Sequence, residues 1–416
     1  MSDEPGAAES LAARVRGLVA TDTSVQEAVR EIVAQVREAG DAALVELTRR
    51  FDTGDAAAGP VRVPRAELDA ALVALDADVR AGLELAIVNV AEVALVALAE
   101  DRELELAQGQ RIVLREVPVR RAAVYVPGGR APYPSTVVMG AVTAETAGVG
   151  EVVVCSPPRS GGSVDPLVLG TCALCGVEEV YAIGGAQAVA ALAFGTESVR
   201  PVDVLVGPGN LYVQEAKRQL QGRIGIDGFA GPTDLLILLD ADADPALAVL
   251  DLLAQAEHGA DSLVCAVSPE GPALDAIEAA LERAGGEANC ALVDAGDLDA
   301  ALAFAEAFAP EHLQLLGAGA EALAPRVRSA GCVFVGAPST AAFGDYIAGT
   351  NHVLPTDGSA RFSSALSPGH FRRRMAEVHI GPAAAALARA AAPIARAEGF
   401  EAHAASMEAR IQENGQ

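Results

Sequence analysis

The 416-residue sequence has little positive charge. Its 30 basic residues face 56 acidic ones, which gives a formal net charge of −26. Nucleic acids and anionic membrane surfaces bind basic proteins, so this balance argues against both as partners. Lys217 is the only lysine, and every other basic residue is an arginine. We interpret this as a bias of composition, accompanied by many alanines and glycines, and expect no mechanism from it.

Targeting and membrane features are also absent from the sequence. The first ten residues are small and acidic, unlike a secretory signal. No uninterrupted apolar run approaches the ~18 residues that a membrane helix needs. Six cysteines in so long a chain are not a disulfide framework, and Cys172 and Cys175 are interpreted as part of an apolar helix. The sequence therefore indicates a reducing, cytoplasmic setting.

Short β-branched runs, Gly/Pro loops and Ala/Leu-rich helices alternate along the central part of the chain. The segments "AAVYVPGG" and "CVFVGAPST" are the first and last clear examples. Continuous apolar runs of four to six residues are typical of parallel strands that are covered on both faces. The pattern therefore predicts an α/β fold of the doubly wound type, and the length predicts two domains. Helical patterns dominate the first ~120 residues and the last ~50.

Histidine is scarce, with six residues, and one of them lies in the stretch "QAEHG". Asp244 suits a helix N-cap, and Gly259 suits the position that ends the same helix. Gln255 and His258 would then be neighbours on one face of its last turn. A metal site is one interpretation of this pair. The other is that His258 serves only as a positively charged cap of the helix C-terminus.

Two further segments combine histidine with a carboxylate. In "APEHL", Glu311 and His312 supply two groups that can move protons near neutral pH, although a solvated turn would look the same. In "GDYIAGTNHVLPT", Asp345 and His352 lie in a glycine-rich loop, where functional residues are often carried. Imidazole and oxygen donors of this kind suit zinc. The remaining histidines carry no local pattern and are interpreted as surface residues: His370, His379 and His403.

Together these segments resemble the histidinol dehydrogenase family over about residues 20–410. The resemblance is carried by "YVPGGRAPYPSTVVM", "GGAQAVAALAFGT", "VGPGNLYVQEAKRQ", "QAEHG", "APEHL", "GDYIAGTNHVLPT", "RFSSALS" and "EGFEAHAASM". It implies a zinc-dependent enzyme that oxidises histidinol to histidine through the aldehyde, with two hydride transfers to NAD. The implied partner is this small substrate, with no nucleic acid and no membrane.

The resemblance also implies a role for individual residues. The implied zinc ligands are Gln255, His258, Asp345 and His403. The implied acid–base pair is Glu311 and His312. The implied NAD contacts are Tyr125, Gln187 and Asn210. The implied substrate contacts are Thr233, Gln255, His258, His312, Asp345, Glu398 and His403.

The family likeness further implies two Rossmann-like, aldehyde-dehydrogenase-like layered domains with parallel sheets. We expect residues 21–124 and 235–366 to form the domain that carries the zinc ligands and the acid–base pair. We expect residues 125–234 to form the domain that contacts NAD. Residues 1–20 are expected to be a helical segment, and residues 367–416 a helical tail. The implied assembly is a homodimer in which this tail brings His403 to the partner's site.

One departure from the family pattern and several alternatives stay open. Thr233-Asp234 stands where the family usually has Ser-Glu; threonine keeps the hydroxyl. The glycine pattern at 317–322, "GAGAEA", is rejected as a dinucleotide fingerprint because no acidic residue closes the next strand. The chain could be another NAD-linked alcohol or aldehyde dehydrogenase, for which Cys155 is the best-placed thiol. It could also be an inactive metal-binding relative.

Overall fold

The computed structural model separates into two units, which are described here one at a time. Unit 1 comprises Met1–Ala97 and Val119–Phe371, and unit 2 comprises Leu98–Pro118 and Arg372–Gln416. Within them, the structure describes residues 6–19, 25–54, 59–128, 131–284 and 288–411. In these ranges, no helix is both long and apolar enough to cross a membrane.

Unit 1 contains two five-stranded parallel sheets that share one strand order. The first sheet runs β5-β4-β3-β6-β7, with β3 Arg121–Tyr125, β4 Glu151–Ser156, β5 Glu179–Ala182, β6 Val204–Val206 and β7 Gly225–Ile226. The second runs β10-β9-β8-β11-β12, with β8 Asp234–Leu239, β9 Leu263–Ser268, β10 Asn289–Asp294, β11 His312–Leu316 and β12 Cys332–Val335. In each sheet the order reverses beside the first strand, at β3/β6 and at β8/β11. Such reversals create crevices at strand ends.

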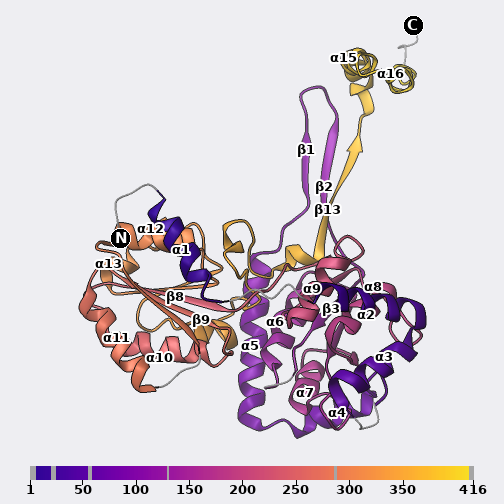
Figure 1. Ribbon diagram of the computed structural model, residues 1–416. Coiled ribbons are helices and arrows are strands. Elements are labelled where there is room, and N and C mark those ends of the chain that lie inside the picture. Colours follow the sequence, from indigo (N-terminus) through magenta and orange to yellow (C-terminus); the bar gives the residue numbers. More distant parts are fainter. Residues whose placement is uncertain (1–5, 20–24, 55–58, 129–130, 285–287, 412–416) are drawn as a thin grey trace. The chain divides into compact units, whose positions relative to one another are not determined.

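Helices cover both faces of the first sheet. One face packs on α2 Gln26–Ala39, α3 Asp41–Thr48, α8 Gly185–Phe194 and α9 Leu211–Leu220. The other face packs on α4 Arg65–Ala74, α6 Pro134–Thr146 and α7 Pro166–Leu174. The long helix α5, Ala77–Val96, packs on α6. These helices and strands form one lobe of Figure 1.

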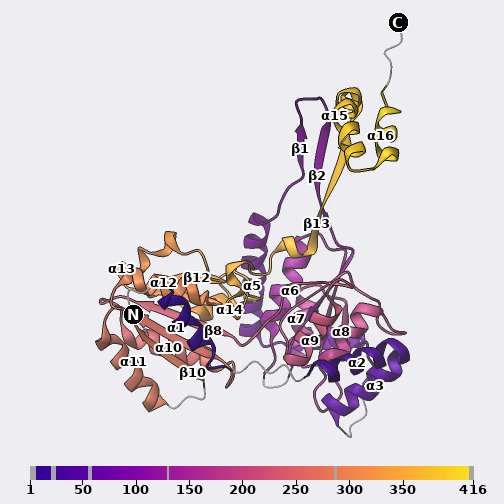
Figure 2. The ribbon, with the colours of Figure 1, turned by 45° about the horizontal axis from the view of Figure 1, so that its top comes forward.

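The second sheet is covered in the same way. Figures 1 and 2 show α1 beside α12 over one face, and Figure 1 shows α10 and α11 along the other. The bounds are α1 Ala7–Arg16, α10 Pro245–Ala256, α11 Gly271–Ala284 and α12 Leu298–Phe308. The shorter helical elements of unit 1 are η1 Arg49–Thr53, α13 Ala318–Glu321, η2 Ala324–Arg326, α14 Ala341–Tyr346, η3 Ser359–Arg361 and η4 Pro368–Phe371.

The sequence pattern explains the two layered sheets. The run "DLLILL" becomes β8, and all six of its residues are buried, as expected for a strand covered on both faces. Asp244 caps α10 through a hydrogen bond that its side chain accepts from the amide of Ala246 at 2.9 Å. The predicted α/β class, with two parallel-sheet layers, is confirmed.

The helices near the N-terminus pack on a sheet that the sequence did not indicate. Residues 21–124 were expected to join residues 235–366 in one domain. In the structure, α2 and α3 share the apolar core of α8 and α9, on the first sheet. The amphipathic pattern of α2 shows which side chains are buried but not which sheet buries them. The division into domains as a whole stays a prediction.

Unit 2 corrects the expectation of a purely helical tail. It contains an antiparallel sheet, β1-β2-β13, followed by a 3-10 turn and two helices. Within the predicted tail 367–416, Arg372–His379 form strand β13, which pairs with β2. None of its residues is buried, so the strand lacks the apolar alternation that reveals strands in a sequence. The bounds are β1 Arg102–Glu105, β2 Arg111–Pro118, β13 Arg372–His379, η5 Gly381–Ala383, α15 Ala384–Ala397 and α16 Glu401–Glu408.

Candidate active site

Four polar residues meet where β8 and β11 begin. Residue 312 pairs with Leu235 in the parallel register of the two strands, so the residues that precede each strand are neighbours. Thr233 donates its hydroxyl to Oε2 of Glu311 at 2.5 Å, and the amide of Asp234 donates to the same oxygen at 3.0 Å. The amide of Glu311 in turn donates to Oδ1 of Asp234 at 2.7 Å. The Glu311 carboxylate is therefore held in one orientation.

The "QAEHG" segment joins this group from the end of α10. Gln255 is buried and donates its Nε2 to the hydroxyl oxygen of Thr233 at 2.6 Å. The helix ends at Ala256, so His258 lies in the turn that follows rather than in the last helical turn. Gly259 adopts a φ of 151°, in the region that favours glycine. The predicted helix end at this glycine is therefore close to the observed one.

Asp345, in α14, links His258 to His312. Its Oδ2 lies 4.0 Å from Nε2 of His258, and its Oδ1 lies 3.5 Å from Nε2 of His312. The acid–base candidates, the substrate candidate Thr233 and three of the four zinc candidates therefore form one connected group. His352 is an addition from the structure, because its Nδ1 donates to the carbonyl of Asp345 at 2.8 Å. The sequence placed His352 in the same loop but gave it no role.

The combined effect of burial and neighbouring charges raises the pKa of both members of the acid–base pair. Burial raises the pKa of Glu311 to about 7, although the adjacent His312 favours its ionised form. Burial lowers the pKa of His312, but Glu311 and Asp345 outweigh it and raise the value to about 9. Nδ1 of His312 lies 3.2 Å from the carbonyl oxygen of Asp234, which can only accept, so this nitrogen carries a proton. Nε2 is then the ring nitrogen at which His312 gains or loses its second proton.

Arg16 and Asp234 are supporting residues that the sequence did not reveal. Asp234 is 1% exposed, and its Oδ2 lies 3.2 Å from Nη1 of Arg16 in α1. Arg16 also donates its Nε to the carbonyl of Phe308 at 3.1 Å. The first contact joins residues 218 positions apart, so no local pattern could show it. Asp234 holds the backbone amide of Glu311 in place, and Arg16 balances the negative charge of Asp234.

The three NAD candidates line a separate cavity of about 810 Å³ in unit 1. Tyr125 is the last residue of β3, and its hydroxyl accepts a hydrogen bond from the amide of Gly185 at 3.0 Å. Asn210 caps α9, and Gln187 donates to Oδ2 of Asp52 at 3.4 Å. Burial raises the pKa of Asp52 to about 6. The cavity lies at the carboxyl ends of β3 and β6, the usual place for a ligand in such a sheet.

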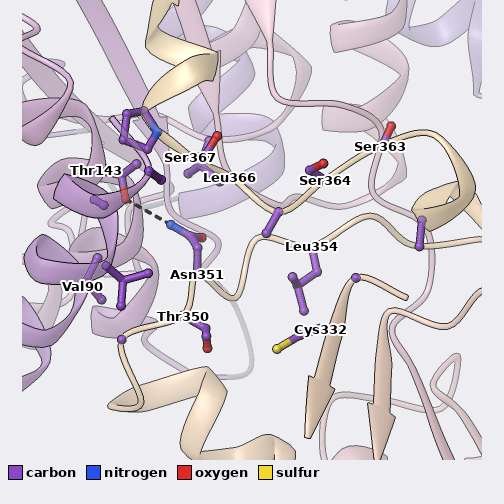
Figure 3. A pocket seen from close by; sticks show the side chains of 18 of the residues that line it. Val90, Thr143, Cys332, Thr350, Asn351, Leu354, Ser363, Ser364, Leu366 and Ser367 are labelled. Atoms are coloured by element: carbon purple, nitrogen blue, oxygen red, sulfur yellow. Dashed lines mark hydrogen bonds between the residues drawn. The ribbon is translucent and has the colours of Figure 1, made fainter. Parts of the chain in front are cut away.

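A second cavity, of about 460 Å³, contains none of the predicted site residues. Figure 3 shows Thr350 and Asn351 on one side of it, with Nδ2 of Asn351 donating to the hydroxyl of Thr143 at 3.1 Å. Ser363 and Ser364 lie on another segment of its wall. We assign this cavity no part in the chemistry.

Two predicted site residues belong to unit 2. Glu398 is the C-cap residue that follows α15, and His403 lies in α16 with its ring centroid 5.2 Å from that of Phe400. Both side chains are exposed. In unit 1, Gln255, His258 and Asp345 offer an amide oxygen, an imidazole and a carboxylate, which is a donor set that fits zinc. Among the described residues, no group of three or more His, Cys, Asp or Glu side chains is arranged to hold a metal ion by itself.

The thiol alternative receives no support from the surroundings of Cys155. Its side chain is completely buried in the first sheet, and burial raises its pKa to about 12 even though Lys217 is nearby. A nucleophilic cysteine needs an accessible thiolate, which favourable charges produce and an apolar core suppresses. Cys155 is therefore a core residue.

The fold and the polar group together define a class of protein. Doubly wound sheets with a cavity at the reversal of strand order are typical of enzymes that bind a nucleotide cofactor. A buried carboxylate beside an imidazole adds acid–base chemistry. The protein thus belongs to the class of cofactor-dependent α/β enzymes.

Comparisons with known proteins give the family. The histidinol dehydrogenase family matches residues 18–411. Histidinol dehydrogenases from Parasynechococcus marenigrum and Rhizobium meliloti are 44% and 42% identical, each over 93% of this chain and 91% and 92% of their own length. The crystal structure of histidinol dehydrogenase from Elizabethkingia anophelis covers 96% of both chains with a TM-score of 0.90 at 30% identity. The chain belongs to the histidinol dehydrogenase family.

Family membership confirms several sequence predictions. Members are NAD-linked oxidoreductases that convert histidinol to histidine in histidine biosynthesis. The family resemblance and the enzyme class inferred from the motifs are therefore confirmed.

Proposed function

We propose that the group around Glu311 and His312 carries out both oxidation steps that convert histidinol to histidine. The observation that carries this proposal is the continuous series of contacts from Gln255 through Thr233, Glu311 and His312 to Asp345. All of these residues come from segments that match the family. NAD, when bound, would supply the chemistry of hydride acceptance in each step.

His312 and Glu311 divide the proton transfers between them. In the first step, the substrate hydroxyl loses a proton, and Nε2 of His312 takes it in the neutral form of the ring, whose share grows as the pH approaches the His312 pKa of about 9. In the second step, water must add to the aldehyde, and the carboxylate of Glu311 removes a proton from that water. A Glu311 pKa of about 7 suits a group that alternates between acid and base near neutral pH.

Zinc is the metal that the donor set fits best, with Gln255, His258 and Asp345 as ligands from unit 1. His403 is the proposed fourth ligand. When bound, zinc contributes positive charge and a fixed position for the substrate, and no redox chemistry. The Thr233 hydroxyl helps to orient both Gln255 and Glu311, which supports its proposed contact with substrate and explains how threonine replaces the usual serine.

The proposed NAD contacts are Tyr125, Gln187 and Asn210. The cavity that they line is large enough for a substantial part of a dinucleotide, since ligand pockets commonly measure ~300–1,000 Å³. Its position at the β3/β6 reversal agrees with the rule for doubly wound sheets. The glycines around it allow close approach of a ligand to the backbone.

The proposed assembly is a homodimer in which unit 2 completes the partner's site. Glu398 and His403 are exposed polar residues on a small unit with a modest apolar core of its own. We propose that His403 binds the zinc of the partner subunit and that Glu398 contacts the partner's substrate. The proposed compartment is the cytoplasm, where the six free cysteines would remain reduced.

Mixed dimers test the shared site. Glu311→Gln and His403→Asn chains, each inactive alone, are refolded together. One site of the mixed dimer then combines both defects, while the other has an intact Glu311 and receives an intact His403 from the partner. Recovered activity supports the shared site. If mixed dimers form and no activity returns, each chain supplies its own His403 and this part of the proposal is wrong.

Formation of NADH from histidinol, measured before and after chelation, tests the function as a whole. We expect activity in the untreated protein, loss after metal removal and recovery with zinc. Full activity in a verified metal-free preparation would exclude the zinc assignment. Absence of NADH with histidinol, combined with turnover of another alcohol or aldehyde, would point to a different dehydrogenase. No turnover at all, despite zinc binding, would indicate an inactive relative.

A further inference from the structure

Lys217 stands apart from all other basic residues of the chain. It is the only lysine in a sequence that otherwise uses arginine, and it lies in α9 with only 1% of its surface exposed. An ammonium is a compact point charge, whereas a guanidinium is a wide planar group. A buried lysine in such a chain therefore indicates a position whose shape accepts the smaller cation.

Lys217 belongs to a closed ring of three contacts around Gly207. Its Nζ donates to the carbonyl of Gly207 at 2.6 Å and to Oδ1 of Asp227 at 2.7 Å. The amide of Gly207 donates to Oδ2 of Asp227 at 2.7 Å. Both side chains of the ion pair are almost completely buried. The pair thus binds both backbone polar groups of a single residue.

Gly207 is the residue at which the chain leaves β6 for the cavity loop. Its φ is 108°, and an added Cβ would lie 2.2 Å from the carbonyl oxygen of Tyr125. Its backbone therefore packs directly on that of Tyr125. Three residues later, Asn210 accepts hydrogen bonds from the amides of Tyr212 and Val213 at 3.1 and 3.2 Å. The position of Gly207 therefore determines how the loop from β6 to Asn210 runs past Tyr125, the other NAD candidate.

We propose that Lys217 and Asp227 are positioning residues for NAD, which act through Gly207 on Tyr125 and Asn210. Neither of the two lines the cavity, so their effect on the cofactor is indirect. This inference rests on the proposed function, in which Tyr125 and Asn210 contact NAD. Arginine at position 217 carries the same charge, but its width displaces the Gly207 carbonyl.

The test measures binding of NAD⁺ and of histidinol to the full-length protein by isothermal titration calorimetry. The variants are Lys217→Met, Lys217→Arg and Asp227→Asn. The control is Arg218→Lys, at a half-exposed neighbouring residue paired with Glu215 on the same helix. We expect the three variants to bind NAD⁺ about tenfold or more weakly. Their affinity for histidinol stays within about twofold of wild type, and the control changes neither value.

Three outcomes overturn the inference. One is unchanged NAD⁺ affinity in a folded Lys217→Met protein. Another is an equal loss of NAD⁺ and histidinol affinity, because this would show general loosening of the fold. The third is failure of both Lys217→Met and Asp227→Asn to fold, which would assign the pair to stability rather than to the loop.

Variants of the proposed contacts separate this inference from the proposed function. Tyr125→Phe and Asn210→Ala should weaken NAD⁺ binding directly. If they do so and the Lys217 variants do not, only the inference fails. If wild-type protein binds NAD⁺ and neither Tyr125→Phe nor Asn210→Ala changes the affinity, the proposed cofactor site itself is wrong.

Discussion

The two sheets of unit 1 have the same strand order but carry their polar sites at opposite ends. In the first sheet, the cavity with Tyr125 and Asn210 lies at the carboxyl ends of β3 and β6. In the second, Glu311 and Thr233 lie at the amino ends of β11 and β8. The general rule for doubly wound sheets describes the first site and not the second. Strand order alone therefore does not show at which end of a sheet the site lies.

The two sites also differ in what builds them. Around Glu311, the contacts that link Gln255, Thr233, Glu311, His312 and Asp345 join side chain to side chain, so the identity of each residue determines the chemistry. Around the cavity, the decisive contacts involve the backbone at Gly207 and Gly185. Substitutions should therefore affect the chemical steps at the first site and affinity for NAD at the second.

The largest effect is expected from Glu311→Gln. The amide keeps the shape of the carboxylate but cannot take a proton from water, so oxidation of the aldehyde should slow at least about a hundredfold. Oxidation of the alcohol should slow less, because its proton goes to His312. Single-turnover NADH formation with histidinol and with the aldehyde measures both. Equal losses in the two steps would contradict the division of roles.

Gly207→Ala should produce the next largest effect, at the other site. The new Cβ would lie 2.2 Å from the Tyr125 carbonyl oxygen, and a φ of 108° is strained for alanine. We expect NAD⁺ to bind about tenfold more weakly, while the free energy of unfolding falls by about 1–3 kcal/mol. Calorimetry and urea unfolding measure the two quantities. Gly222→Ala, also at positive φ but with open space around its Cβ, is the matched control.

Asp52→Asn tests the electrostatics of the cavity. Burial raises the pKa of Asp52 from 3.8 to about 6, so the folded protein holds this proton more tightly than the unfolded chain does. The stabilisation that this bound proton contributes to the folded protein is fully present below about pH 3.8, and it is lost as the pH rises through about 6. Removal of the charge should therefore stabilise the protein by about 1–2 kcal/mol at pH 7, allowing for partial solvent screening.

Urea unfolding between pH 4 and pH 7 would show the Asp52 effect as a gain that grows with pH. Glu100→Gln, at an exposed side chain, is the control for replacing a carboxylate by an amide. A constant difference between Asp52→Asn and wild type across this pH range would show that Asp52 does not titrate as described.

Cys155→Ala should have the smallest effect on catalysis. The thiol is buried and its pKa is raised to about 12, so turnover should remain within about twofold of wild type. Steady-state NADH formation is the measurement, with thermal unfolding as the check on folding. A folded variant without turnover would restore the thiol mechanism.

The sequence predicted much of the fold because buried parallel strands are continuous apolar runs. It predicted β8 and the start of α10 from the apolar run "DLLILL" and the cap at Asp244. It did not predict β13, whose residues have no buried face, or the sheet on which α2 packs. These features depend on contacts between distant segments, which local patterns do not encode.

In the candidate site, too, the sequence predicted features that depend on local residue type and missed those that depend on distant contacts. Glu311 and His312 could be proposed from their chemistry alone, and the structure places Thr233 and Asp345 in contact with them. The cavity residues came from the family resemblance, because a backbone shape has no signature in residue type. Arg16 was missed because its partner Asp234 lies 218 residues away. In the sequence, Lys217 is indistinguishable from a bias of composition. Only its burial in the structure indicates a role for it.

The most direct test of the contrast between the two sites measures the NAD⁺ dissociation constant and the single-turnover rate at saturating NAD⁺ in the same two variants. For Glu311→Gln, we predict a slow aldehyde step and an unchanged dissociation constant. For Gly207→Ala, we predict the reverse: weak NAD⁺ binding with an almost unchanged rate once the cofactor is bound. If each variant changes both quantities to a similar extent, the two sites do not have separate functions and the account is wrong.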